Sequence, residues 1–266
     1  MKPEHDVNES SPGSHPPHRF RRGIYLLPSM FTVANIFCGY ACVVYAMRGD
    51  FQTAASLIGV AFVVDMLDGR IARLTGTTSA FGREFDSLAD VISFGMAPAV
   101  LTFAWGLFQL GRLGWLAGFL FVTATALRLA RFNIQSAGMY DKRYFVGMPS
   151  PAAAAVPAAT VYAWPYPLGD YRHAMLALAV VLVPALLMVS TVRFRSFKTF
   201  NLGWRRSYLW LFVIAAALAL VASEPRITLV VLAYGYLLFA LVELIVNRIR
   251  RRGAPPPAPE SEQTPA

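Results

Sequence analysis

Residues 63–90 read VVDMLDGRIARLTGTTSAFGREFDSLAD and lie between two apolar runs, AASLIGVAFVV at 54–64 and VISFGMAPAVLTFAW at 91–105. Apolar segments of this kind are typical of helices that cross a bilayer, which need about 20 residues. The stretch nevertheless contains five acidic residues, Asp65, Asp68, Glu84, Asp86 and Asp90. An ionised carboxylate in hydrocarbon costs a few kcal/mol unless it faces a polar cavity and a partner. The stretch therefore predicts membrane helices that enclose a polar site.

Further apolar segments follow on both sides of this stretch. We expect eight transmembrane helices, at 27–47, 52–74, 86–108, 113–131, 149–165, 173–192, 207–223 and 227–247. The fifth contains three prolines and the seventh is short, but proline is tolerated in membrane helices whose neighbours satisfy the freed carbonyls. The composition agrees, with 56% hydrophobic and 15% charged residues, where a soluble domain has about 25% charged residues. The sequence predicts an all-α, polytopic integral membrane helical bundle.

The two ends of the chain differ from this apolar body. Residues 1–22 and 253–266 are rich in proline and polar residues, and we expect both to be disordered tails because they can bury little apolar surface. Two cysteines and four histidines exclude a disulfide scaffold and a Cys/His zinc site of the usual spacing.

The distribution of basic residues predicts which side of the membrane each loop faces. With eight spans both tails lie on one side, and only Arg48, Arg112, Arg172 and Arg226 fall in loops of the other side, which leaves 20 of the 24 basic residues on the side of the tails. Such an asymmetry marks the cytoplasmic face. The net charge of +9 then reflects loops beside an anionic leaflet, and we expect no nucleic-acid partner.

Spacing predicts that the acidic residues converge. Asp65 and Asp68 are three residues apart and Asp86 and Asp90 four apart, so each pair shares one helix face. Both pairs lie near the cytoplasmic ends of adjacent spans. Four oxygen donors without histidine or cysteine suit Mg²⁺, Mn²⁺ or Ca²⁺. The alternative is a structural ion-pair network with Arg70, Arg73 and Arg83, although three arginines cannot easily offset five acids.

The same stretch resembles the signature of the CDP-alcohol phosphatidyltransferases, D-x-x-D-G-x-x-A-R-x8-G-x-x-x-D-x-x-x-D. All eight fixed positions match: Asp65, Asp68, Gly69, Ala72, Arg73, Gly82, Asp86 and Asp90. Within this family the chain is most similar to the phosphatidylserine synthases, over residues 24–200. That branch has a six-helix core with two additional helices, which implies a core at 23–200 and two extra helices at 201–252.

The resemblance implies a reaction and its cofactors. The hydroxyl of an acceptor, here L-serine, attacks the lipid-bearing phosphorus of CDP-diacylglycerol, and CMP leaves. Two divalent ions, Mg²⁺ or Mn²⁺ and conceivably Ca²⁺, are then held by Asp65, Asp68 and Asp86, while Asp90 joins them or acts as the base. A homodimer in a cytoplasmic (inner) membrane of bacterial type, with membrane lipids as further partners, is implied as well.

Other residues are assigned with alternatives left open. Gly69, Ala72, Arg73 and Gly82 are expected to contact CDP, although small residues also serve helix packing. Asn35 either reaches the nucleotide or forms a helix–helix hydrogen bond. The serine carboxylate needs a cation, for which the candidates are Arg128, Arg131 and Arg143, and an arginine at a cytoplasmic helix end is otherwise explained by topology alone.

Two alternative functions remain open at this point. Other acceptors (glycerol phosphate, inositol phosphate, choline) or an archaeal-type lipid donor would use the same signature. A divalent-cation transporter would also place carboxylates in membrane helices, but transporter sites usually lie at the midplane between repeats.

Overall fold

The computed structural model describes residues 26–75, 79–137, 144–190, 193–195, 215, 219–220 and 222–252. Within these ranges the backbone alone is described for some residues, including Ala72 and Arg73. The expected tails at 1–22 and 253–266, and most of the expected span at 207–223, lie outside the described residues.

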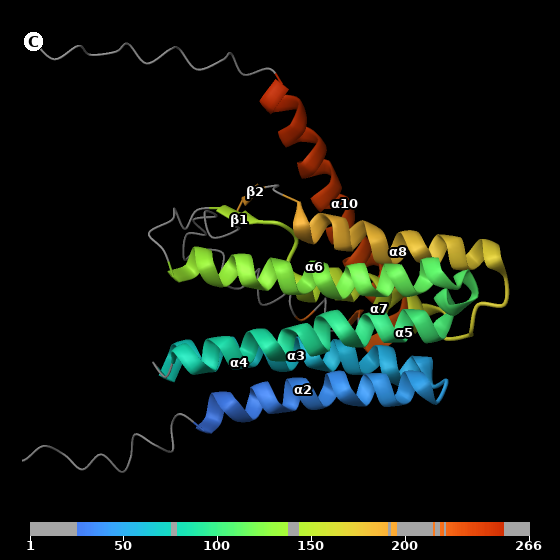
Figure 1. Cartoon of the computed structure of the whole chain (residues 1–266). Coiled ribbons are helices and arrows are strands. Elements are labelled where there is room, and N and C mark those ends of the chain that lie inside the picture. Colours follow the sequence, from blue (N-terminus) through green and yellow to red (C-terminus); the bar gives the residue numbers. More distant parts are fainter. Residues whose placement is uncertain are drawn as a thin grey trace, which may run out of the picture.

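Helices make up nearly all of the described chain (Figure 1). In chain order they are α2 (Leu26–Met47), α3 (Phe51–Thr75), α4 (Ala80–Asp90), the π-helical turn η1 (Val91–Met96), α5 (Ala97–Trp105), the 3₁₀ turn η2 (Leu107–Leu110), α6 (Arg112–Ala137), α7 (Ser150–Ala163), α8 (Tyr171–Val189) and α10 (Pro225–Arg252). Two three-residue strands, β1 (Tyr144–Val146) and β2 (Arg193–Arg195), pair antiparallel. The predicted all-α class is confirmed.

Five of the described helical segments are long and apolar enough to cross a membrane, so the chain is a multi-pass membrane protein. These segments are Met30–Met47, Ala80–Trp105, Arg112–Gln135, Tyr171–Val189 and Pro225–Val246. α3 has 25 residues and carries part of the acidic stretch. α7 has only 14 residues, or about 21 Å at 1.5 Å per residue, which is shorter than the hydrocarbon core. The count of eight spans stays a prediction.

Helix α4 starts earlier than the sequence analysis predicted. The expected span began at 86, whereas α4 begins at Ala80, where Ser79 is the N-cap and its hydroxyl accepts a hydrogen bond from the amide of Gly82. A serine at this position satisfies one of the free amides of the first turn and so fixes the start of a helix. As a result Asp86 and Asp90 lie in the second and third turns of the helix.

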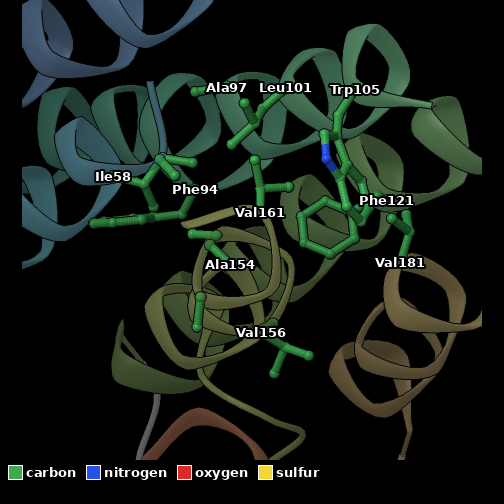
Figure 2. Close-up of a cluster of buried hydrophobic side chains, with 14 of the residues drawn as sticks. Ile58, Phe94, Ala97, Leu101, Trp105, Phe121, Ala154, Val156, Val161 and Val181 are labelled. Atoms are coloured by element: carbon green, nitrogen blue, oxygen red, sulfur yellow. The ribbon is translucent and has the colours of Figure 1, made fainter. Parts of the chain in front are cut away.

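Small residues let the helices approach closely. α2 and α3 pack against each other, and their buried apolar side chains include Cys38, Cys42, Ala46, Ala54, Ala55, Ile58 and Ala61. Larger side chains fill the centre of the bundle, where Trp105 lies near Phe121 of α6, Leu101 near Val161 of α7, and Phe94 near Ile58 of α3 (Figure 2). Large exposed apolar side chains, such as Phe37 at 65% and Leu186 at 71%, are expected on helices that face lipid.

Helices α4, η1 and α5 form one continuous rod that contains a π-helical turn directly after Asp90. π-turns are rare and frequently lie at functional sites. This turn brings Ser93 against α2, where its hydroxyl donates a 2.8 Å hydrogen bond to the carbonyl of Asn35. The approach depends on Gly39, because a Cβ there would lie 2.9 Å from the Cα of Ser93.

We expect Gly39→Ala to lower the thermal unfolding temperature of the solubilised protein, because overpacking costs about 1–3 kcal/mol. The matched control is Gly59→Ala on α3, where a Cβ would meet nothing within 4 Å in the described part of the chain. Since alanine favours helix over glycine by about 1 kcal/mol, the control should keep or raise the unfolding temperature. Equal effects of the two variants would contradict the close contact between α2 and η1.

Candidate active site

Three of the four expected aspartates come together between α3 and α4. Asp65 of α3 and Asp86 and Asp90 of α4 each offer a carboxylate oxygen, and these oxygens lie within 4.8 Å of one another. Asp86 and Asp90 share a helix face because they are four residues apart. Asp90 is buried, with 8% of its surface exposed, while Asp65 and Asp86 are half-buried.

Asp68 is not a member of this group. It is buried, and its Oδ2 accepts a 2.6 Å hydrogen bond from the hydroxyl of Thr32 on α2. Its charge still acts on Asp65 and Asp86. The structure therefore shows three clustered carboxylates with a fourth beside them, held from a neighbouring helix.

Two buried polar side chains at the cluster have unsatisfied atoms. Asn35 is 1% exposed, and among the described residues its amide nitrogen and oxygen have no hydrogen-bond partner of normal geometry, as is also true of Oδ1 of Asp90. The two side chains are near enough to interact. Buried polar groups normally have a partner, and a bound ion, water or ligand is the usual partner where the protein supplies none.

The donor set of this group fits a divalent cation. It consists of carboxylate oxygens from three aspartates, the ligands that Mg²⁺, Mn²⁺ and Ca²⁺ prefer over those of zinc. A cation also supplies the positive charge without which several carboxylates at this distance repel one another. The acidic group can therefore hold a metal ion.

Arg128 is the arginine that the structure places at the cluster. Its charge acts on Asp65 and Asp90, and its Nη1 donates a 2.8 Å hydrogen bond to Ser150 at the start of α7. The guanidinium also lies 5.6 Å from the centre of the Phe132 ring. Arg131 is directed elsewhere, since its Nη1 donates to the carbonyl of Val189 at 3.2 Å, and Arg143 lies outside the described residues.

The small signature residues have different surroundings. Gly69 is exposed, and a Cβ there would meet no atom of the described residues within 4 Å, so among these residues none crowds the helix surface beside Asp68. At Gly82 a Cβ would lie 3.0 Å from the Ser79 hydroxyl, which links this glycine to the helix cap. Ala72 and Arg73 lie on α3, but their side chains are outside the described residues.

Three polar residues near the site were not singled out from the sequence. Thr32 and Ser150 bind Asp68 and Arg128, and the Asn133 amide donates to Glu84 Oε2 at 3.2 Å and to Ser87 Oγ at 3.0 Å. All three lie within residues 24–200, over which the sequence resembles the phosphatidylserine synthases. Their polar character near apolar spans was the available signal, but their partners depend on how the helices pack.

We expect Thr32→Val to weaken the enzyme without abolishing it. Hydrogen bonds to charged groups contribute about 1.5–3 kcal/mol, so releasing Asp68 should reduce kcat/KM by about 10- to 100-fold. The matched control is Thr102→Val on α5, a buried threonine whose hydroxyl bonds to the carbonyls of its own helix. Steady-state kinetics that show the same loss for both variants would contradict a specific role for the contact between Thr32 and Asp68.

Comparison with known families identifies the class of this fold and site. Residues 25–185 match the family model of the CDP-alcohol phosphatidyltransferases. The chain belongs to this family and is a transferase. The match covers α2 to most of α8, including the three clustered aspartates, and leaves α10 outside.

Individual relatives of the family are similar to the chain over different shares of its length. The chain is 37% identical over 236 residues to a CDP-diacylglycerol–serine O-phosphatidyltransferase of Helicobacter pylori strain J99, covering 85% of this chain and 96% of the relative. It is 40% identical over 145 residues to the protein of that name from Mycobacterium leprae, covering 53% and 48%. An archaetidylserine synthase of Methanothermobacter thermautotrophicus is 34% identical over 170 residues, covering 63% and 69%.

Proposed function

We propose that the chain is a phosphatidylserine synthase, which transfers the phosphatidyl group of CDP-diacylglycerol to the hydroxyl of L-serine and releases CMP. The observation that carries the proposal is the cluster of Asp65, Asp86 and Asp90 at signature positions of the family. The names of the three relatives all specify serine, which supports this acceptor over glycerol phosphate, inositol phosphate or choline.

Two divalent ions, Mg²⁺ or Mn²⁺, are proposed as cofactors. Asp65 and Asp86 would hold them, with Asp90 beside them and with Asp68 at the edge of the site, where Thr32 fixes its orientation. Bound there, the ions would neutralise the pyrophosphate and stabilise the charge that develops on the transferred phosphoryl group.

Asp90 is the proposed general base. Its Oδ1 has no hydrogen-bond partner of normal geometry among the described residues, so it can accept the proton of the serine hydroxyl as the oxygen attacks phosphorus. The new P–O bond forms while the bond between phosphorus and CMP breaks, and the proton stays on Asp90. A positioned base of this kind contributes about 10²–10⁴ to the rate.

Arg128 is the best placed candidate to bind the serine carboxylate. Its charge reaches Asp90, so a serine carboxylate at Arg128 would lie beside the base. Ser150 and Phe132 hold the guanidinium in place, and its five donors allow a two-point contact with a carboxylate. Arg131 and Arg143 remain second candidates.

The nucleotide is proposed to lie along α3 and the start of α4. Gly69 leaves the surface of α3 open, so the CDP moiety can approach the backbone there, with Ala72, Arg73, Gly82 and Asn35 as further contacts. We also propose that the site and both termini face the cytoplasm at the inner membrane, with a catalytic core at 23–200, two added helices at 201–252, and a homodimer embedded in membrane lipids.

Radiolabelled serine tests the proposal. Purified protein is incubated with CDP-diacylglycerol and Mn²⁺ or Mg²⁺, and we expect lipid-soluble label, stoichiometric release of CMP, and loss of both on addition of EDTA. Incorporation of labelled glycerol phosphate, inositol phosphate or choline in place of serine would reassign the acceptor, and preference for an archaeal ether-lipid donor would reassign the donor. Metal uptake by proteoliposomes without CMP release would instead indicate a cation transporter.

A further inference from the structure

Asn133 of α6 connects two helices that otherwise have little contact. Its amide nitrogen donates to Glu84 Oε2 at 3.2 Å and to Ser87 Oγ at 3.0 Å, both on α4. The Ser87 hydroxyl in turn donates to the carbonyl of Arg83 at 3.0 Å, so its oxygen is available as the acceptor for Asn133. The amide group of Asn133 therefore binds two side chains that lie about one turn apart on α4.

The contact adds a restraint from α6 to a helix whose main other contacts are with α2 and with η1, into which it continues. The backbones of α3 and α6 hardly approach α4. The acidic group nevertheless requires Asp86 and Asp90 of α4 to lie beside Asp65 of α3. Small rotations of α4 would separate these carboxylates.

The two bonds restrain this rotation. At about 100° per residue, the face of α4 that carries Glu84 and Ser87 lies about 110° around the axis from the face that carries Asp86 and Asp90. Asn133 therefore restrains α4 without occupying the face that carries the two aspartates. Asn133 touches residues on both sides of Asp86 in the sequence but has no bond to Asp86 itself among those described.

We infer that Asn133 is a positioning residue, which sets the rotation of α4 and thereby the metal affinity of the site formed by Asp65, Asp86 and Asp90. The inference rests on the proposed function for its metal and deepens that function by adding a residue outside the eight-position signature. Partners that orient metal-binding side chains typically change metal affinity by about 10- to 100-fold when they are removed.

The test measures Mn²⁺ binding to the full chain in detergent by isothermal titration calorimetry, together with activity as a function of Mn²⁺ concentration. Asn133→Ala should raise the Mn²⁺ Kd by about tenfold or more and shift the half-saturating Mn²⁺ concentration of the reaction in parallel. The KM for serine at saturating Mn²⁺ should stay near that of the wild type. A general loss of structure would change both.

Two further variants show whether the change in Mn²⁺ Kd is specific to the contact between Asn133 and α4. Tyr234→Phe removes a 2.8 Å hydrogen bond to Thr160 between α10 and α7, so it is a matched loss of one interhelical bond away from the acidic group, and its Mn²⁺ Kd should not change. Asn133→Asp combined with Glu84→Gln exchanges donor and acceptor, and it should recover most of the affinity that Asn133→Asp alone loses.

If Asn133→Ala does not fold, Glu84→Ala removes one acceptor and should weaken Mn²⁺ binding in the same direction. A wild-type Mn²⁺ Kd in folded Asn133→Ala, or an equal change in Tyr234→Phe, would overturn the inference. A different result would refute the proposed function and leave the role of Asn133 intact. In that case the wild type binds Mn²⁺ but forms no lipid from serine.

Discussion

Asp86→Asn should abolish serine-dependent release of CMP while the protein still inserts into the membrane. Asp86 lies centrally in the acidic group, four residues from Asp90 and close to Asp65 of the neighbouring helix. Removing one charged ligand takes away several kcal/mol of charge stabilisation in the transition state, which corresponds to about 10³-fold in rate. Asp68→Asn should act in the same direction, because Asp68 borders the group and is held by Thr32.

The control for Asp86→Asn is Asp170→Asn. Asp170 caps the start of α8 by accepting a hydrogen bond from the amide of Arg172, and asparagine caps helices equally well. This variant should retain wild-type rates, whereas Asp86→Asn should lose both activity and Mn²⁺ binding at equal expression. Wild-type activity in Asp86→Asn would refute the assignment of a metal site.

Asp90→Asn should stop the chemical step but preserve most of the binding of CDP-diacylglycerol. An amide cannot accept the proton of the serine hydroxyl, so the rate should fall by about 10²–10⁴. Asparagine keeps the size of the side chain and an oxygen that can still face Asn35. Turnover and CDP-diacylglycerol binding are measured separately on the purified variant, the latter by calorimetry at saturating metal.

The loss of turnover relative to the loss of CDP-diacylglycerol binding defines the role of Asp90. A large loss of turnover with a small loss of binding supports the base. If the binding of CDP-diacylglycerol is lost to the same extent as turnover, Asp90 acts as a metal ligand instead, and the proton must be taken up by another group.

Much of the acidic group could be predicted from spacing alone. Asp86 and Asp90 share a face of any helix that contains them, and the helix ends place Asp65 at a similar depth. The separate environment of Asp68 could not be predicted, because its bond to Thr32 depends on the rotation of α2 against α3. The sequence indicated that Asn35 was unusual in its apolar surroundings, but not that both its polar atoms are buried beside Asp90.

The π-turn and the pairing of the two short strands could not be predicted either, because they too depend on contacts between distant segments. Nothing in the residues 91–96 indicates a π-turn, since its energy depends on the fit of Ser93 against Gly39. The pairing of β1 with β2 involves three residues from each of two distant segments, too few for a periodic pattern. The early start of α4 could have been predicted, because Ser79 is a good cap and precedes the expected span.

The wide turn after Asp90 holds one residue more than an α-helical turn of the same height, so the helical segments on either side of it keep a common angular phase. Deleting one residue between 91 and 96 would therefore close the turn into a regular α-helix and leave α5 in place. An α-helix that retained the extra residue would instead turn α5 by about 100°, and Leu101 and Trp105 would leave the interior of the bundle. The turn thus absorbs one additional residue while the aspartates and the apolar core stay aligned.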